Sequence, residues 1–160
     1  AVLVHPSIPP GSDFLDLERF NLTASVGFTF DTTLAVSRMI YAGFIDDHPN
    51  LKLIAAHAGG YLPFLAGRLD ICYENIPSCR EVLTQPPSTY LDRIYYDAVV
   101  FTQEALDLCL NVAGADNVLY GSDYPHNIGD MKGCLARVDT LAPDVRDRIR
   151  GKNAERVFGL

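Results

Sequence analysis

The sequence of 160 residues lacks long apolar runs, clusters of basic residues and repeats, and each absence bears on the class of protein. No apolar run approaches the length of a membrane span, so we expect no contact with a membrane. The formal net charge is −7 and the basic residues are scattered, which argues against nucleic acid as a partner. The 48% of hydrophobic and 21% of charged residues are typical of one globular domain spanning residues 1–160.

Paired cysteine motifs are also missing. The four cysteines form no CxxC pair and lie in segments with a helical pattern: Cys72, Cys79, Cys109 and Cys134. We interpret them as reduced packing residues rather than a disulfide framework or a zinc knuckle. This interpretation predicts a cytoplasmic location.

Short apolar runs are present, and they recur along the chain. They are "AVLV" (1–4), "LKLIAA" (51–56), the more mixed "IYYDAVV" (94–100) and "NVLYGS" (117–122). Runs of this length without strict alternation are typical of strands buried on both faces, as in a parallel sheet. The first run begins at Ala1, so we expect further residues to precede it.

Helical patterns lie between these runs. We expect helices over 31–49, ending at Pro49, over 61–75 and over 102–114, and two short helices in the tail separated by Gly151. The segments 7–30 and 77–90 are expected to be mostly loop. Four strand–helix units indicate an α/β fold with a parallel sheet, either half of a (β/α)8 TIM barrel or a small doubly wound sheet.

Three of the four runs are followed by a residue that can bind a metal or carry a proton. His5 follows "AVLV", His57 follows "LKLIAA" and Asp123 follows "NVLYGS". Because the carboxyl ends of parallel strands share one edge, these side chains are expected to converge there. Each residue alone is more typical of a structural histidine or a turn aspartate, and only their coincidence favours a site.

Three stretches carry a resemblance to a known family: "LKLIAAHAGGYLPFLAGRLD" (51–70), "VLYGSDYPH" (118–126) and "IRGKNAERVFGL" (149–160). With them, the sequence resembles the amidohydrolase-2 family, which includes decarboxylases of the 2-amino-3-carboxymuconate-6-semialdehyde type and of aromatic acids. The resemblance implies that the four units are the C-terminal half of a (β/α)8 TIM barrel, and that the chain is part of a larger metal-dependent protein.

The resemblance also implies roles for four residues. His5 and Asp123 match the metal-binding histidine and aspartate of the family's fifth and eighth strands. His57 matches the catalytic acid/base histidine of the sixth strand, and histidine suits this role because its side chain titrates near neutral pH. Arg68 matches an arginine that binds the substrate carboxylate from a neighbouring subunit, where a guanidinium can hold it with two hydrogen bonds.

The sequence departs from the family at several positions. No His-x-His pair, which supplies the family's other metal ligands, occurs anywhere in the chain. Ser7 and His126 stand where the decarboxylases usually carry aromatic residues. His126 is interpreted either as a substrate-contacting group or as a loop histidine. Asp97 either faces the barrel interior near the site or hydrogen bonds to a neighbouring strand, and we favour a structural role.

These observations predict a metal-dependent decarboxylase of an aromatic or unsaturated carboxylic acid. Zn²⁺ is the expected ion, with Mn²⁺ or Fe²⁺ as alternatives, and a homo-oligomer, most simply a dimer, is the expected assembly. The alternatives are a metal-dependent hydrolase of a lactone or amide and a half-barrel remnant without catalytic activity. The chain by itself is expected to be inactive and to bind metal weakly.

Overall fold

The four expected strands are present and form a single parallel sheet. The structure is a computed structural model that describes residues 1–160. The strands are β1 (Val2–Val4), β2 (Leu53–Ala55), β3 (Tyr95–Asp97) and β4 (Val118–Leu119). Each is paired in parallel with the next, in the order β1-β2-β3-β4. The predicted α/β class with a parallel sheet is therefore confirmed.

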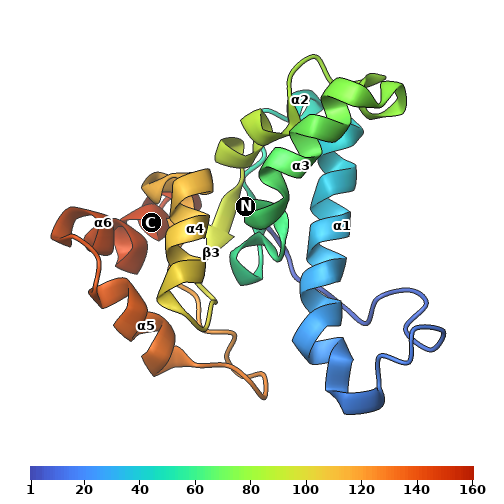
Figure 1. The fold of residues 1–160 in the computed structure, drawn as a ribbon. Coiled ribbons are helices and arrows are strands. Elements are labelled where there is room, and N and C mark those ends of the chain that lie inside the picture. Colours follow the sequence, from blue (N-terminus) through green and yellow to red (C-terminus); the bar gives the residue numbers. More distant parts are fainter.

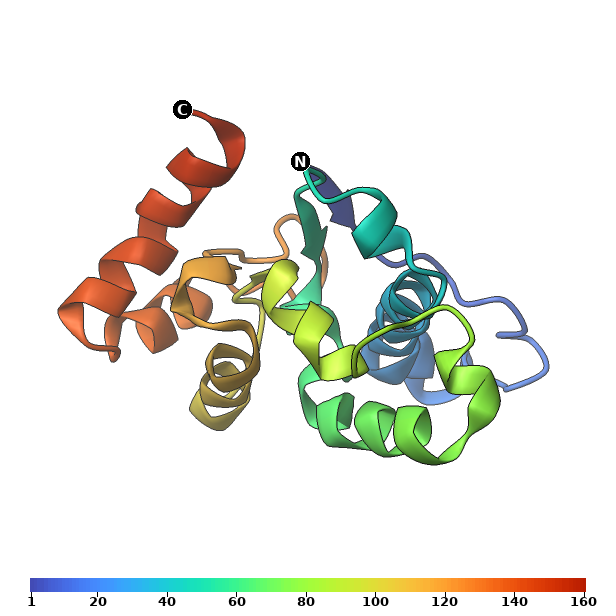
Figure 2. The same ribbon diagram turned by 90° about the horizontal axis from the view of Figure 1, so that it is seen from above.

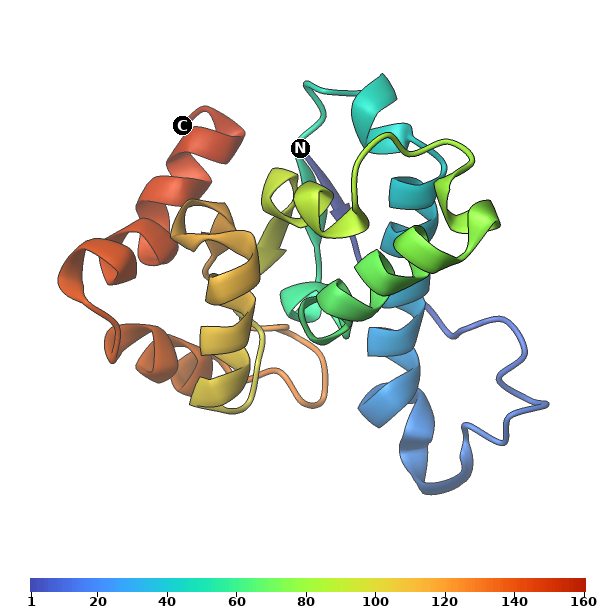
Figure 3. The same ribbon diagram turned by 45° about the horizontal axis from the view of Figure 1, so that its top comes forward.

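Helices separate the strands along the chain (Figure 1). Their bounds are α1 (Phe28–Tyr41), α2 (Phe44–Asp47), α3 (Leu62–Asn75), α4 (Gln103–Ala113), α5 (Met131–Asp139), α6 (Pro143–Asp147) and α7 (Asn153–Phe158). Short 3₁₀ segments occupy Pro77–Arg80 and Pro87–Arg93. The segment that precedes α1 extends away from the rest of the molecule (Figure 3). No helix is both long and apolar enough to cross a membrane.

The main hydrophobic core lies between the sheet and helices α1, α3 and α4. Figure 2 shows these three helices on the same side of the strands. The side chains of Leu53 and Tyr96 point to this side and are almost fully buried, together with Ile40 of α1 and Leu106 of α4. The opposite face carries a smaller cluster, in which Ile54 and Leu119 pack against Val157 of α7.

Three helical expectations differ from the structure. The single helix expected over 31–49 starts earlier and breaks at Gly43, where a φ of 75° ends α1 and begins α2. Gly151 does not separate two tail helices, because a π-helical turn over Arg148–Lys152 joins α6 to α7. Helix α5 was not expected, and Asp130 caps it by accepting a hydrogen bond from the Gly133 N–H at 2.7 Å.

Candidate active site

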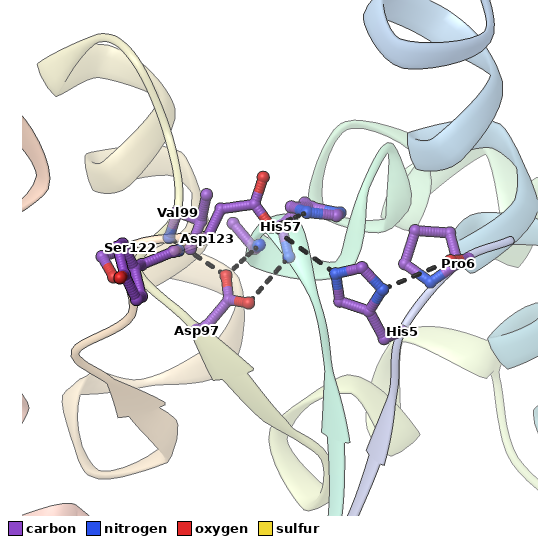
Figure 4. Close-up of polar contacts among 9 residues, drawn as sticks. His5, Pro6, His57, Asp97, Val99, Ser122 and Asp123 are labelled. Atoms are coloured by element: carbon purple, nitrogen blue, oxygen red, sulfur yellow. Dashed lines mark hydrogen bonds and ion pairs between the residues drawn. The ribbon is translucent and has the colours of Figure 1, made fainter. Parts of the chain in front are cut away.

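Residues that follow β1, β2 and β4 meet at the carboxyl end of the sheet (Figure 4). His5 comes directly after β1, His57 follows Ala56 beyond β2, and Asp123 follows a short turn after β4. Parallel pairing places all these strand ends at one edge, so residues 118 positions apart in sequence come into contact. We refer to His5, His57 and Asp123 as the strand-end cluster.

The strand-end cluster is arranged around one carboxylate oxygen. Asp123 Oδ1 lies 3.5 Å from His5 Nε2 and 3.3 Å from His57 Nε2. One ligand atom from each residue lies within 4.8 Å of the others. The side chain of Asp123 is only 7% exposed and that of His57 12%, whereas His5 is 37% exposed. His5 is thus the member of the cluster nearest to solvent.

The turn after β2 explains the Gly-Gly step that follows His57. His57 and Ala58 have φ values of 55° and 51°, in the left-handed region that non-glycine residues rarely adopt. Gly60 also has a positive φ, of 65°, and a methyl group there would collide with the Thr29 carbonyl oxygen and the Thr33 hydroxyl of α1. The glycine therefore lets the turn lie directly against α1, which fixes the position of His57.

A pocket of about 320 Å³ lies beside the strand-end cluster. Its lining includes His5 and Asp123, and also His126 and Phe158. The His126 ring stacks on that of His5, with centroids 5.3 Å apart and an angle of 15° between the planes. Of the two interpretations of His126, its position in the pocket wall favours contact with a bound molecule.

Asp97, at the end of β3, contacts the turn that carries His57. Its Oδ2 accepts a hydrogen bond from the His57 N–H, and its Oδ1 accepts bonds from the N–H groups of Ala58 and Val99, all at 3.0 Å. Burial raises the pKa of Asp97, and these N–H donors together with the nearby His57 side chain oppose that rise. These hydrogen bonds to the turn of the neighbouring strand support the structural role that we favoured, and Asp97 also lines the pocket.

Arg68 does not join the strand-end cluster within this chain. It lies on α3, is exposed, and forms no hydrogen bond or ion pair. It is also absent from the lining of the pocket. Within this chain, Arg68 therefore lies apart from both the strand-end cluster and its pocket.

The family is established by comparison with known proteins. The family model described as Amidohydrolase matches residues 1–160, so the chain belongs to this family. The resemblance inferred from residues 51–70, 118–126 and 149–160 is thereby confirmed.

Similar proteins whose function is known include decarboxylases. The chain is 31% identical to 2-amino-3-carboxymuconate-6-semialdehyde decarboxylase of Dictyostelium discoideum, over 100% of this chain and 45% of the relative. It is 26% identical to gamma-resorcylate decarboxylase of Rhizobium sp., over 98% of this chain and 50% of the relative. The chain thus spans about half the length of the curated relatives that it matches.

A solved structure supports the same relationship. The crystal structure of 5-carboxyvanillate decarboxylase from Sphingomonas paucimobilis superposes with a TM-score of 0.88 at 28% identity, over 100% of this chain and 49% of that one.

Proposed function

We propose that this chain carries one part of the active site of a metal-dependent decarboxylase, whose substrate is an aromatic or unsaturated carboxylic acid. The observation that carries the proposal is the strand-end cluster, which brings two imidazoles and a carboxylate together at the edge where such barrels do their chemistry. The decarboxylase activities of the relatives support the choice of reaction.

The donor set of the strand-end cluster fits a divalent metal. Imidazole nitrogen and carboxylate oxygen are ligands of Zn²⁺ and of Mn²⁺. His5 and Asp123 would hold the ion, together with ligands from outside this chain, because the chain has no His-x-His pair. We propose Zn²⁺ as the ion, with Mn²⁺ as the alternative. The alternative is supported by the crystal structure of a 5-carboxyvanillate decarboxylase from Novosphingobium aromaticivorans in complex with manganese. That structure is 26% identical, with a TM-score of 0.85 over 99% of this chain and 47% of that one. A bound divalent metal supplies Lewis-acid polarisation of substrate oxygens.

His57 supplies the proton in the proposed reaction. The bond between the carboxyl carbon and the neighbouring carbon breaks, CO₂ leaves, and that carbon takes a proton from the protonated His57 imidazole, which becomes neutral and regains a proton from water. His57 suits this role because its side chain is only 12% exposed and its Nε2 lies 3.3 Å from Asp123, which lines the pocket, whereas His57 itself is not part of the lining. The His126 ring, stacked on His5, forms part of the wall against which a flat substrate would lie.

We further propose that the four βα units are the C-terminal half of a (β/α)8 barrel. The strand order follows the chain order without the reversal that a doubly wound sheet contains, which supports a barrel arc. The first strand has an open edge, where Val2 and Leu3 are 48% and 53% exposed, and an unpaired apolar edge of this kind calls for a further strand. On this proposal residues 1–160 are one domain-sized piece of a larger barrel domain.

A dimer in which Arg68 reaches the neighbouring active site is the assembly that we propose. Phe64 and Ile71 flank Arg68 on the same face of α3 and are 79% and 58% exposed. Large exposed apolar side chains around a charged residue are typical of a contact surface. We also keep the proposal of a cytoplasmic location, which the four unpaired cysteines support.

The test is to incubate the full-length protein, with Zn²⁺ or Mn²⁺ supplied, with a panel of hydroxybenzoates and unsaturated dicarboxylates and with a second panel of lactones and amides. The proposal expects release of CO₂ and appearance of the decarboxylated product. Opening of a lactone or amide without release of CO₂ would instead identify a hydrolase. Absence of both reactions would favour a remnant without catalytic activity.

A further inference from the structure

Asp97 makes an unusual set of contacts for a carboxyl group at the end of a strand. All three of its hydrogen bonds come from backbone N–H groups, those of His57, Ala58 and Val99, each at 3.0 Å. Two of these donors belong to the turn after β2, about 40 residues earlier in the chain. The carboxyl group of Asp97 therefore ties the end of β3 to the turn that carries His57 (Figure 4).

The turn that Asp97 holds is strained. His57 and Ala58 both have φ values near the left-handed region, 55° and 51°, and such residues cost on the order of 1 kcal/mol each. Such a turn is stable only when surrounding contacts offset this cost. The hydrogen bonds from the His57 and Ala58 N–H groups to Asp97 are contacts that stabilise this backbone conformation.

Asp97 also lies against the turn after β4. A methyl group on Gly121 would approach Asp97 Cβ to 2.9 Å and Val99 Cγ2 to 3.1 Å, so the backbone at Gly121 passes directly over the Asp97 side chain. Asp123 follows two positions later. One side chain thus borders both turns that place the His57 imidazole next to the Asp123 carboxylate.

We infer that Asp97 is a positioning residue, whose carboxyl group holds the His57 imidazole at the strand-end cluster through its hydrogen bonds to the backbone of the turn. The effect on rate rests on the proposed function, because it presupposes that His57 acts on the substrate. The anchoring of the turn does not depend on the reaction.

The variant Asp97→Asn tests this inference with little change in volume. An asparagine side chain has one acceptor oxygen and one NH₂ group, so it cannot accept on both sides. The asparagine NH₂ group then faces either the His57 N–H or the N–H groups of Ala58 and Val99, and two donors cannot form a hydrogen bond. The turn is expected to lose at least one hydrogen bond while the β3 backbone stays in place.

The experiment measures two quantities on the full-length protein. Hydrogen exchange at His57 or at Ala58, whichever N–H group faces the asparagine NH₂ group, is expected to become at least about tenfold faster in the variant, because its hydrogen bond to the side chain is lost. The kcat for release of CO₂ is expected to fall about 100-fold, since small displacements of a catalytic group have effects of this size. KM is expected to stay within about threefold, because both carboxyl oxygens of Asp97 already accept hydrogen bonds from backbone N–H groups.

The matched control is Asp46→Asn, which alters another hydrogen-bonded carboxylate, one that accepts from Tyr90 and Arg93. It is expected to leave both kcat and exchange at His57 and Ala58 unchanged. Unchanged exchange in Asp97→Asn, or unchanged kcat in a protein that releases CO₂, overturns the inference. If the wild-type protein releases no CO₂, the proposed function fails, and faster exchange still supports the anchoring of the turn by Asp97.

Discussion

His57 differs from the other residues of the strand-end cluster in its surroundings. Its Nε2 lies 3.3 Å from Asp123, but its Nδ1 is buried and has no hydrogen-bond partner. A buried ring nitrogen without a partner is costly in a purely structural histidine. Packing alone therefore does not account for a histidine at this position.

Replacing His57 by glutamine is therefore expected to lower kcat by about 10²- to 10⁴-fold, the usual contribution of a general acid or base. The measurement is the rate of CO₂ release by the full-length protein. The control is His48→Gln, since His48 lies beyond α2 and packs against the Phe44 ring, with centroids 4.4 Å apart and the planes tilted by 56°, outside the pocket of the cluster. Equal rates for the His57→Gln variant and the wild type would show that His57 does not act as the proton donor.

Gly60 is the residue whose replacement should most disturb the turn after β2. Gly60→Ala combines a positive φ of 65° with a collision between its methyl group and α1, so we expect a loss of about 2–3 kcal/mol in the free energy of unfolding. In Gly151→Ala the added methyl group meets no atom within 4 Å, and the change is expected to stay within about 0.5 kcal/mol. Denaturant unfolding measures both, and equal effects of the two substitutions would contradict this account of the turn.

At the scale of elements, α2 is held to the 3₁₀ segment Pro87–Arg93 by one carboxylate. Asp46 accepts hydrogen bonds from the Tyr90 hydroxyl at 2.8 Å and from Arg93 at 2.6 Å. The bond from Arg93 first, and then that from Tyr90, hold the pKa of Asp46 below its usual value. A carboxylate with a lowered pKa stabilises the fold above its unfolded pKa and loses this effect as the pH falls through the folded value.

The variant Asp46→Asn is consequently expected to be less stable than the wild type near about pH 7, with a difference that shrinks toward about pH 3. Urea unfolding midpoints at several pH values measure this difference. If the variant and the wild type differ in stability by the same amount at both pH values, the ionised Asp46 carboxylate does not stabilise the contact between α2 and the 3₁₀ segment.

The elements could be predicted from sequence where local patterns decide them. The apolar runs gave the four strands, and the spacing over 61–75 gave α3 almost to the residue. The break at Gly43 was missed, because the sequence alone did not reveal that this glycine adopts the left-handed conformation. Helix α5 was missed because its apolar face is narrow and its start depends on the cap formed by Asp130.

The residues of the candidate site could also be predicted where local sequence patterns place them. His5, His57 and Asp123 each follow an apolar run, and the geometry of parallel strands is enough to bring such residues together. A hydrogen bond from Asp97 to a neighbouring strand was among the interpretations, but its individual backbone partners were not predictable, because they belong to a strained turn about 40 residues away. The stacking of His126 on His5 likewise depends on the path of the loop after β4.

At the scale of the whole molecule, the position of Arg68 on an outer helix face makes a specific prediction about assembly. In a two-fold dimer whose subunits exchange Arg68, the variants Arg68→Ala and His57→Gln should each be weakly active alone. Co-expressed, they should form mixed dimers with one complete site, and overall activity should recover to about a quarter of that of the wild type.

The control for this experiment is a mixture of the two variants as separately purified dimers, kept under conditions in which subunits do not exchange. It is expected to show no recovery. An Arg68 that acted within its own subunit would give no recovery in the co-expressed sample either, because neither kind of subunit would carry both residues.

The most direct measurement of the central claim is the metal content of the full-length protein, compared with that of its Asp123→Asn and His57→Gln variants. The account predicts about one equivalent of Zn²⁺ or Mn²⁺ in the wild type, since on the proposed function His5 and Asp123 would supply ligands to a single ion. It also predicts loss of most of this metal in Asp123→Asn and its retention in His57→Gln. A wild-type protein free of metal, or an Asp123→Asn variant that keeps its full content, would contradict the account.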